Sequence, residues 1–74
     1  MGKGGKEMNY EKNFKDDYEH IVNRYNELCE VVDNYDTTDI RPNCPKDMLE
    51  MQLDAMYNLI KIMETRANTE GISL

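Results

Sequence analysis

Two apolar stripes with heptad spacing constrain the fold of this 74-residue chain more than any other feature. In each stripe the steps alternate between four and three residues, the seam of a helix that packs lengthwise against another helix. The first stripe consists of Phe14, Tyr18, Ile21, Tyr25, Leu28, Val32 and Tyr35. The second consists of Leu49, Leu53, Met56, Ile60, Met63 and Ala67. Because one turn-rich break separates them, the pattern predicts an all-α fold, an antiparallel two-helix hairpin.

The chain divides into a short N-terminal segment and one helical domain. Residues 1–9 are rich in Gly and Lys, a composition that predicts disorder. A first helix is expected over residues 10–35, which contain neither Gly nor Pro. The single domain, residues 10–74, begins with this helix.

The break and the second helix follow from turn and cap residues. Thr, Asp, Asn and Pro crowd residues 36–44, and each of them favours turns. The second helix is expected over residues 45–68, since Pro45 suits the first helical position. Gly71 then suits the C-cap of that helix.

A hairpin of this size lacks the means to stabilise itself alone. Below about 70–80 residues a single core rarely supplies more than about 3–5 kcal/mol. Two cysteines do not form a disulfide framework, and Cys29, Cys44 and His20 lack the paired spacing of zinc ligands. Asp33, Asp36 and Asp39 lack the alternation of a calcium loop. We therefore expect no metal or other cofactor, and expect the hairpins to assemble into a helical-bundle homo-oligomer through their seams.

The charge distribution excludes several function classes. Residues 16–40 contain eight acidic residues and one basic residue, a net charge of −7, which opposes binding to DNA or RNA. No stretch approaches the roughly 18 apolar residues of a membrane span. The sequence shows no secretory signal, and a cytoplasmic protein is expected. No catalytic constellation or glycine-rich phosphate loop is present, so the chain is not expected to be an enzyme.

Four residues near the expected hairpin ends are candidate ligand contacts. Tyr10, at the start of the first helix, could stack on a base. Arg41, Asn43 and Lys46 could hold an anion with the amides that open the second helix. Packing of the tyrosines in the core, and ion pairs of the two cations with acidic residues of the loop, are the structural alternatives.

The second half of the chain resembles small bacteriophage proteins, including a helical-hairpin family of crAss-like phages. The resemblance rests on Gln52, Leu53, Ala55 and Met56, followed by an ending of Ile62, Met63, Glu64 and Arg66, and extends over residues 16–67 as a hairpin. More distantly, the layout is similar to the hairpin domain of phage sponge proteins that counter the CBASS and Thoeris defences. Those proteins sequester cyclic nucleotide signals between subunits.

The resemblance implies a phage-encoded, non-enzymatic inhibitor of antiphage immunity in the cytoplasm of the infected bacterium. Such a protein would sequester a cyclic nucleotide or related signalling molecule at subunit interfaces. Two alternatives stay open. One is an interaction module that binds and blocks a host defence protein with its acidic face and methionines; the other is an accessory protein of the virion or its assembly.

Overall fold

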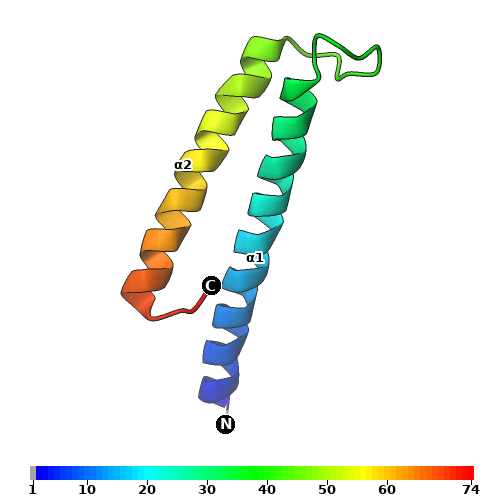
Figure 1. The fold of residues 1–74 in the computed structure, drawn as a ribbon. Coiled ribbons are helices and arrows are strands. Elements are labelled where there is room, and N and C mark those ends of the chain that lie inside the picture. The colour runs from blue at the N-terminus through cyan, green and yellow to red at the C-terminus, as the bar shows by residue number, and fades with distance from the viewer. Residues whose placement is uncertain (1) are drawn as a thin grey trace.

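The computed structural model describes the backbone of residues 2–74 and the side chains of residues 9–74. Helix α1, Gly2–Asp33, and helix α2, Lys46–Glu70, are joined by a loop (Figure 1). The helices run in opposite directions, and the part of the chain that the structure describes contains no strand. The predicted all-α antiparallel hairpin is therefore confirmed.

The first helix begins earlier than the sequence suggested. We expected it to start at Tyr10 after a disordered segment over residues 1–9, but the backbone is helical from Gly2. Extending an existing helix costs far less than nucleating one, so residues with weak propensity can continue it. Met1 and the side chains of residues 2–8 lie outside the described part of the chain. Disorder of residues 1–9 in solution stays a prediction.

Side chains of the loop end α1 at Asp33, two residues before the expected end. The Asn34 side-chain amide donates to the Glu30 carbonyl at 2.9 Å. The Thr37 hydroxyl and the Thr37 backbone N–H both donate to the Asn34 carbonyl, at 3.2 and 3.1 Å. These bonds compete with continued helix, which is why Asn and Thr favour turns.

Pro45 and Gly71 bracket α2. Pro45 is the N-cap with extended backbone, not the first helical residue as expected, and α2 ends at Glu70 rather than Asn68. Gly71 has a φ of 72°, the left-handed conformation of a helix C-cap. The Ile72 N–H donates to the Ala67 carbonyl at 2.8 Å, which turns the buried Ile72 side chain back onto the helix.

The two stripes pack against each other within one chain. No residue of either stripe is exposed, and the most buried of them lie away from the loop. The main cluster consists of Phe14, Met63, Ala67 and Ile72, with Tyr18 and Ile21 packed against it. Because the seams face each other inside the hairpin, contact with another subunit needs a different surface.

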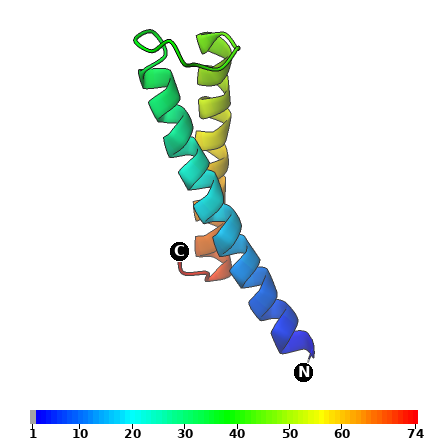
Figure 2. The same cartoon turned by 90° about the vertical axis from the view of Figure 1, so that its right-hand side faces the viewer.

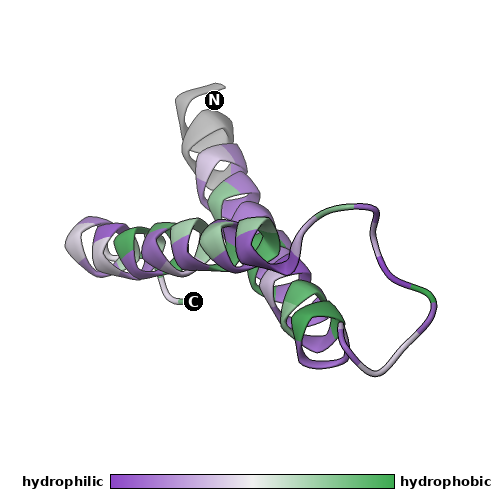
Figure 3. Ribbon diagram, turned by 90° about the horizontal axis from the view of Figure 1, so that it is seen from above, coloured by the Kyte–Doolittle hydropathy of each residue, from purple (hydrophilic) through white to green (hydrophobic). Residues whose placement is uncertain are grey.

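The hairpin is elongated. Its extents are 54 × 20 × 16 Å, and its radius of gyration is 16.3 Å, against about 11 Å for a compact domain of this length. The helices cross rather than run parallel (Figure 2), and the loop projects to one side when the molecule is viewed from above (Figure 3). Neither described helix has an apolar stretch long enough to cross a membrane.

Candidate functional site

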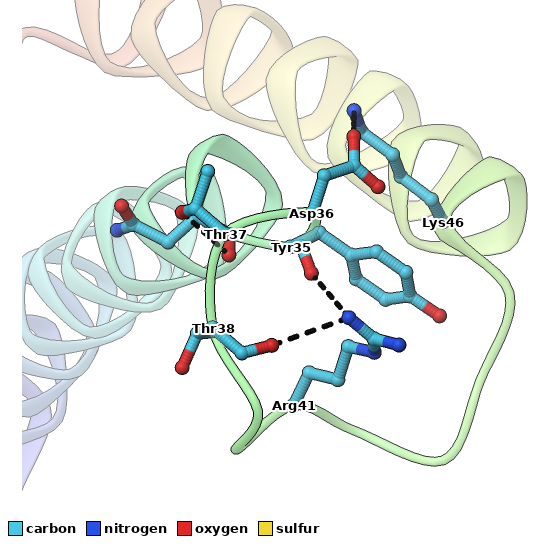
Figure 4. A network of polar contacts seen from close by, with 7 residues as sticks. Tyr35, Asp36, Thr37, Thr38, Arg41 and Lys46 are labelled. Atoms are coloured by element: carbon cyan, nitrogen blue, oxygen red, sulfur yellow. Dashed lines mark hydrogen bonds and ion pairs between the residues drawn. The ribbon is translucent and has the colours of Figure 1, made fainter.

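Three of the four expected ligand contacts, Arg41, Asn43 and Lys46, lie in or beside the loop. The Arg41 side chain points into the loop, toward the backbone of Tyr35 and Thr38 (Figure 4). Its Nη1 donates hydrogen bonds to the carbonyl oxygens of Tyr35, at 2.9 Å, and Thr38, at 3.2 Å. Among the described contacts, neutral carbonyls rather than carboxylates hold this guanidinium.

Tyr35 supports Arg41 and fixes the loop at the same time. The Arg41 guanidinium carbon lies 5.1 Å from the centroid of the Tyr35 ring, within the range of a cation–π contact. The Tyr35 hydroxyl donates to the Cys44 carbonyl at 2.6 Å, which ties the end of α1 to the residues before α2. The sequence placed Tyr35 on the seam and did not predict this polar role.

Lys46 forms an ion pair. Its Nζ lies 3.1 Å from an Asp36 carboxylate oxygen, and the hydrogen bond to that carboxylate raises the pKa of Lys46 (Figure 4). The Asp36 side chain is 74% exposed, so solvent screens the pair and its contribution to stability is small. The two loop cations thus differ: Lys46 has a carboxylate partner, whereas Arg41 is bound by carbonyls.

The loop residues line an open hollow of about 530 Å³. It is lined by Tyr35, Asp39, Arg41, Pro42, Asn43, Cys44 and Pro45. Arg41 and Asn43 thus share one surface, which offers guanidinium and amide donors beside an aromatic ring. This volume lies within the range of small-molecule sites, about 300–1,000 Å³, although the hollow has no wall on its outer side. The Asp39 carboxylate in the lining opposes an anion bound deep in the hollow.

Tyr10, the fourth expected contact, lies at the other end of the hairpin. Its hydroxyl donates to Glu70 Oε1 at 2.7 Å and accepts from Arg66 Nη2 at 2.7 Å. The hydrogen bond to the Glu70 carboxylate raises the pKa of Tyr10. The Arg66 guanidinium also covers the Phe14 ring, 4.9 Å from its centroid. Within one chain, the structure therefore does not bring Tyr10 together with Arg41, Asn43 and Lys46.

The cluster of Tyr10, Arg66 and Glu70 was missed by sequence reasoning, although a signal for it exists. In an antiparallel hairpin, residues on the two helices face each other when their numbers have a nearly constant sum. The residue numbers of facing seam positions in this chain sum to about 80. The same sum pairs Tyr10 with Glu70 and Tyr18 with Glu64. The structure contains both pairs, and the Tyr18 hydroxyl donates to Glu64 at 2.7 Å.

The described residues contain no group of three His, Cys, Asp or Glu side chains that could hold a metal ion. Cys29 and Cys44 are free thiols. What the two ends offer is recognition groups: guanidinium and amide donors, phenol hydroxyls and aromatic faces. Such groups can bind a polar aromatic molecule without converting it.

Comparison with known proteins identifies the family. The model of the family described as Sequestin matches residues 8–69, most of the chain. No curated protein and no solved structure was found to match. The family's name denotes sequestration, a role of binding and holding rather than of catalysis. The matched range covers most of both helices and the whole loop, and this chain belongs to the Sequestin family.

Proposed function

We propose that this protein is a phage-encoded inhibitor of bacterial antiphage immunity that sequesters a nucleotide-derived immune signal. It acts in the cytoplasm of the infected cell as a homo-oligomer, and the signal lies at a subunit interface. Membership of a sequestering family supports binding as the activity. The resemblance to phage hairpin proteins suggests the kind of ligand.

One observation carries the proposal: Arg41 lies on the Tyr35 ring at the edge of an open hollow. The hydrogen bonds of Arg41 to the described residues use Nη1 alone, whereas a guanidinium has five N–H donors. Arginine donors suit phosphate oxygens, and an aromatic face suits a base. Asn43, in the same hollow, supplies an amide for a base edge or a ribose.

The acidic loop still allows an anionic ligand to bind. Lys46 neutralises Asp36 through its ion pair, so the carboxylate that remains near the hollow is Asp39. A phosphate at the rim would contact Arg41, and Asp39 would oppose it. The hollow also lacks an outer wall, and a second subunit would supply one and exclude water, which strengthens ionic contacts.

The test is titration of the purified protein with cyclic and linear nucleotides by isothermal calorimetry. The variant Arg41→Glu with Lys46→Glu should abolish binding, because it replaces both loop cations with carboxylates. A matched control, Lys12→Glu with Arg24→Glu, changes the net charge equally on the exposed surface of α1 and should bind as the wild type does.

If loop and control variants bind a nucleotide equally well, the loop is not the site. If the wild type binds none of the nucleotides, native mass spectrometry of protein from infected, defence-positive cells decides the question. A stoichiometric small-molecule mass would support sequestration, and a bound host protein would favour the interaction-module alternative.

A further inference from the structure

Besides its seam, α2 has another apolar stripe, on a face that α1 does not cover. It consists of Met48, Met51, Ala55, Leu59 and Ile62, which we call the outer stripe. The four large side chains are 60%, 68%, 43% and 56% exposed in chain order. At about 100° per residue, the outer stripe lies roughly 120° around the helix from the seam. It is an apolar surface that remains exposed after the hairpin has closed.

The spacing of the outer stripe is symmetric about Ala55. The steps along it are three, four, four and three residues, so reversing the helix direction exchanges Met48 with Ile62 and Met51 with Leu59. A two-fold contact has this property, since residue i of one copy meets residue j of the other and the reverse. The smallest side chain of the stripe lies at the centre, where two helices approach most closely.

Charge favours the antiparallel orientation of two such helices. Asp47, Asp54 and Lys61 lie on one edge of the outer stripe, and an antiparallel two-fold pair brings this edge against itself. Lys61 of one copy is then within about 3 Å along the axis of Asp47 of the other, and the pair forms twice. A parallel pair in register would instead leave Lys61 of one copy about 21 Å along the axis from Asp47 of the other, so neither pair would form.

Lys61 can form this contact without breaking a strong one. It is paired with Glu64 at 3.5 Å on an exposed surface, and its ammonium lies 5.5 Å from the Tyr57 ring centroid. The antiparallel pair has one unfavourable feature: the two copies of Asp54 face each other near the axis. Because like charges repel, removing the charge of Asp54 should strengthen the dimer, whereas removing the charge of Lys61 should weaken it.

We propose that the outer stripe of α2 binds the outer stripe of a second copy, antiparallel, with the two-fold axis at Ala55. The shared stripe is about 21 Å long, and one helix-to-helix contact of this length buries less surface than the standard interface of about 1,600 Å². The pair is therefore weak by itself, and a ligand that contacts both copies stabilises it by mass action.

This pairing adds detail to the proposed function. Its consequence for ligand binding rests on that proposed function. Lys46 lies about 13 Å from the axis along α2, and Arg66 lies about 16 Å from it in the other direction. In the antiparallel pair the loop of one copy is therefore level with Arg66 and Tyr10 of the second copy. At each end of the dimer the loop hollow of one copy and Tyr10 of the other therefore lie at a similar height along the axis.

Disulfide trapping tests the contact without any nucleotide. In a background of Cys29→Ala and Cys44→Ala, chains with Met48→Cys are mixed with chains with Ile62→Cys and oxidised. We expect crosslinked dimers in the mixture at a level well above that of either chain alone. Chains with Asn23→Cys, an exposed site on α1, replace the Ile62→Cys chains as the control. Crosslinking of either variant with itself, or equal crosslinking in the control mixture, would overturn the proposal.

Sedimentation equilibrium supplies a second, independent measurement. Lys61→Glu should weaken the dimer, and Asp47→Lys added to it should restore the affinity, whereas Asp54→Asn alone should tighten the dimer. Burying a carboxylate with Met51→Glu should raise the dissociation constant by about tenfold or more. Circular dichroism verifies that each variant folds. A wild-type monomer throughout the concentration range, or Met51→Glu that dimerises unchanged, would refute the interface.

The two proposals can fail separately. Trapping of the predicted pair by a protein that binds no nucleotide would leave the interface standing and refute the proposed function. Nucleotide binding by a protein that forms no trapped pair would do the reverse. If both hold, Tyr10→Ala should weaken nucleotide binding although Tyr10 lies far from the loop of its own chain.

Discussion

At the end of the hairpin near the C-terminus, α1 and α2 are held together by one apolar cluster, whereas at the loop end hydrogen bonds to backbone carbonyls add to the smaller apolar contribution of Val32 and Leu49. The first end has Phe14, Met63, Ala67 and Ile72 in one cluster. The loop end has the bonds from Arg41 and from Tyr35 to carbonyl oxygens. Apolar burial is worth more than solvent-accessible hydrogen bonds, so most of the stability belongs to the first end.

The largest expected effect is at the packed end. Phe14→Ala should cost about 3–5 kcal/mol, because Phe14 is 5% exposed and its loss leaves a cavity under Arg66. That loss matches all that a core of this size supplies, so the variant should be largely unfolded at 25 °C. Circular dichroism at 222 nm against temperature measures it. Arg24→Ala, an exposed change, should melt with the wild type, and a cooperative wild-type melt for Phe14→Ala would mean that the cluster is not the main support.

Gly71→Ala should have the next largest effect, about 1–2 kcal/mol. Gly71 has a φ of 72°, and an added Cβ meets nothing within 4 Å, so the cost is backbone strain without a clash. Urea unfolding measures the change as a lower midpoint. Equal midpoints for Gly71→Ala and the wild type would show that the chain reversal before Ile72 contributes little to the packed end.

Tyr35→Phe tests the loop end and should cost about 0.5–1.5 kcal/mol, the usual contribution of one hydrogen bond. The variant loses the 2.6 Å bond to the Cys44 carbonyl but keeps the ring under Arg41. We expect a small drop in the urea midpoint and faster hydrogen exchange confined to the loop and the first turn of α2. Uniformly faster exchange across both helices would contradict the division between the two ends.

The smallest effect should appear in the acid dependence of stability. The hydrogen bond from Tyr18 lowers the pKa of Glu64, so Glu64 binds a proton less readily in the folded chain than in the unfolded chain. This contribution is complete above the ordinary glutamate pKa of about 4.3 and is lost as the pH falls through the lower folded pKa. The difference in melting temperature between the wild type and Tyr18→Phe should therefore narrow between pH 6 and about pH 3. A constant difference would show that the bond does not change the protonation of Glu64.

The fold was predictable because the heptad pattern is repeated on both sides of one break. A single turn-rich break between two seams of similar length lets one helix fold back on the other, so the spacing and the break together predicted the antiparallel hairpin. The helix ends were less predictable. Pro45 suits both the N-cap and the first helical residue, and its backbone ψ, which decides between them, depends on the path of the loop.

The candidate site was predicted only in part. Composition pointed to Arg41 and Asn43, and both line the loop hollow. The role of Tyr35 was hidden, since a seam tyrosine looks like core until the loop folds over it. Tyr10 was grouped with the loop cations as a residue of the hairpin ends, but one chain holds them at opposite ends.

The sequence by itself determined the two helices, their direction and the residues between them, because burial of periodic apolar residues depends on spacing that the sequence states directly. Only the tertiary structure decided which side chains remain available for a ligand or a second copy. Lys46 is paired with Asp36, Arg41 is held by carbonyls, and the outer stripe of α2 is exposed. These outcomes depend on how the helices cross and how the loop returns, which distances along the chain do not specify.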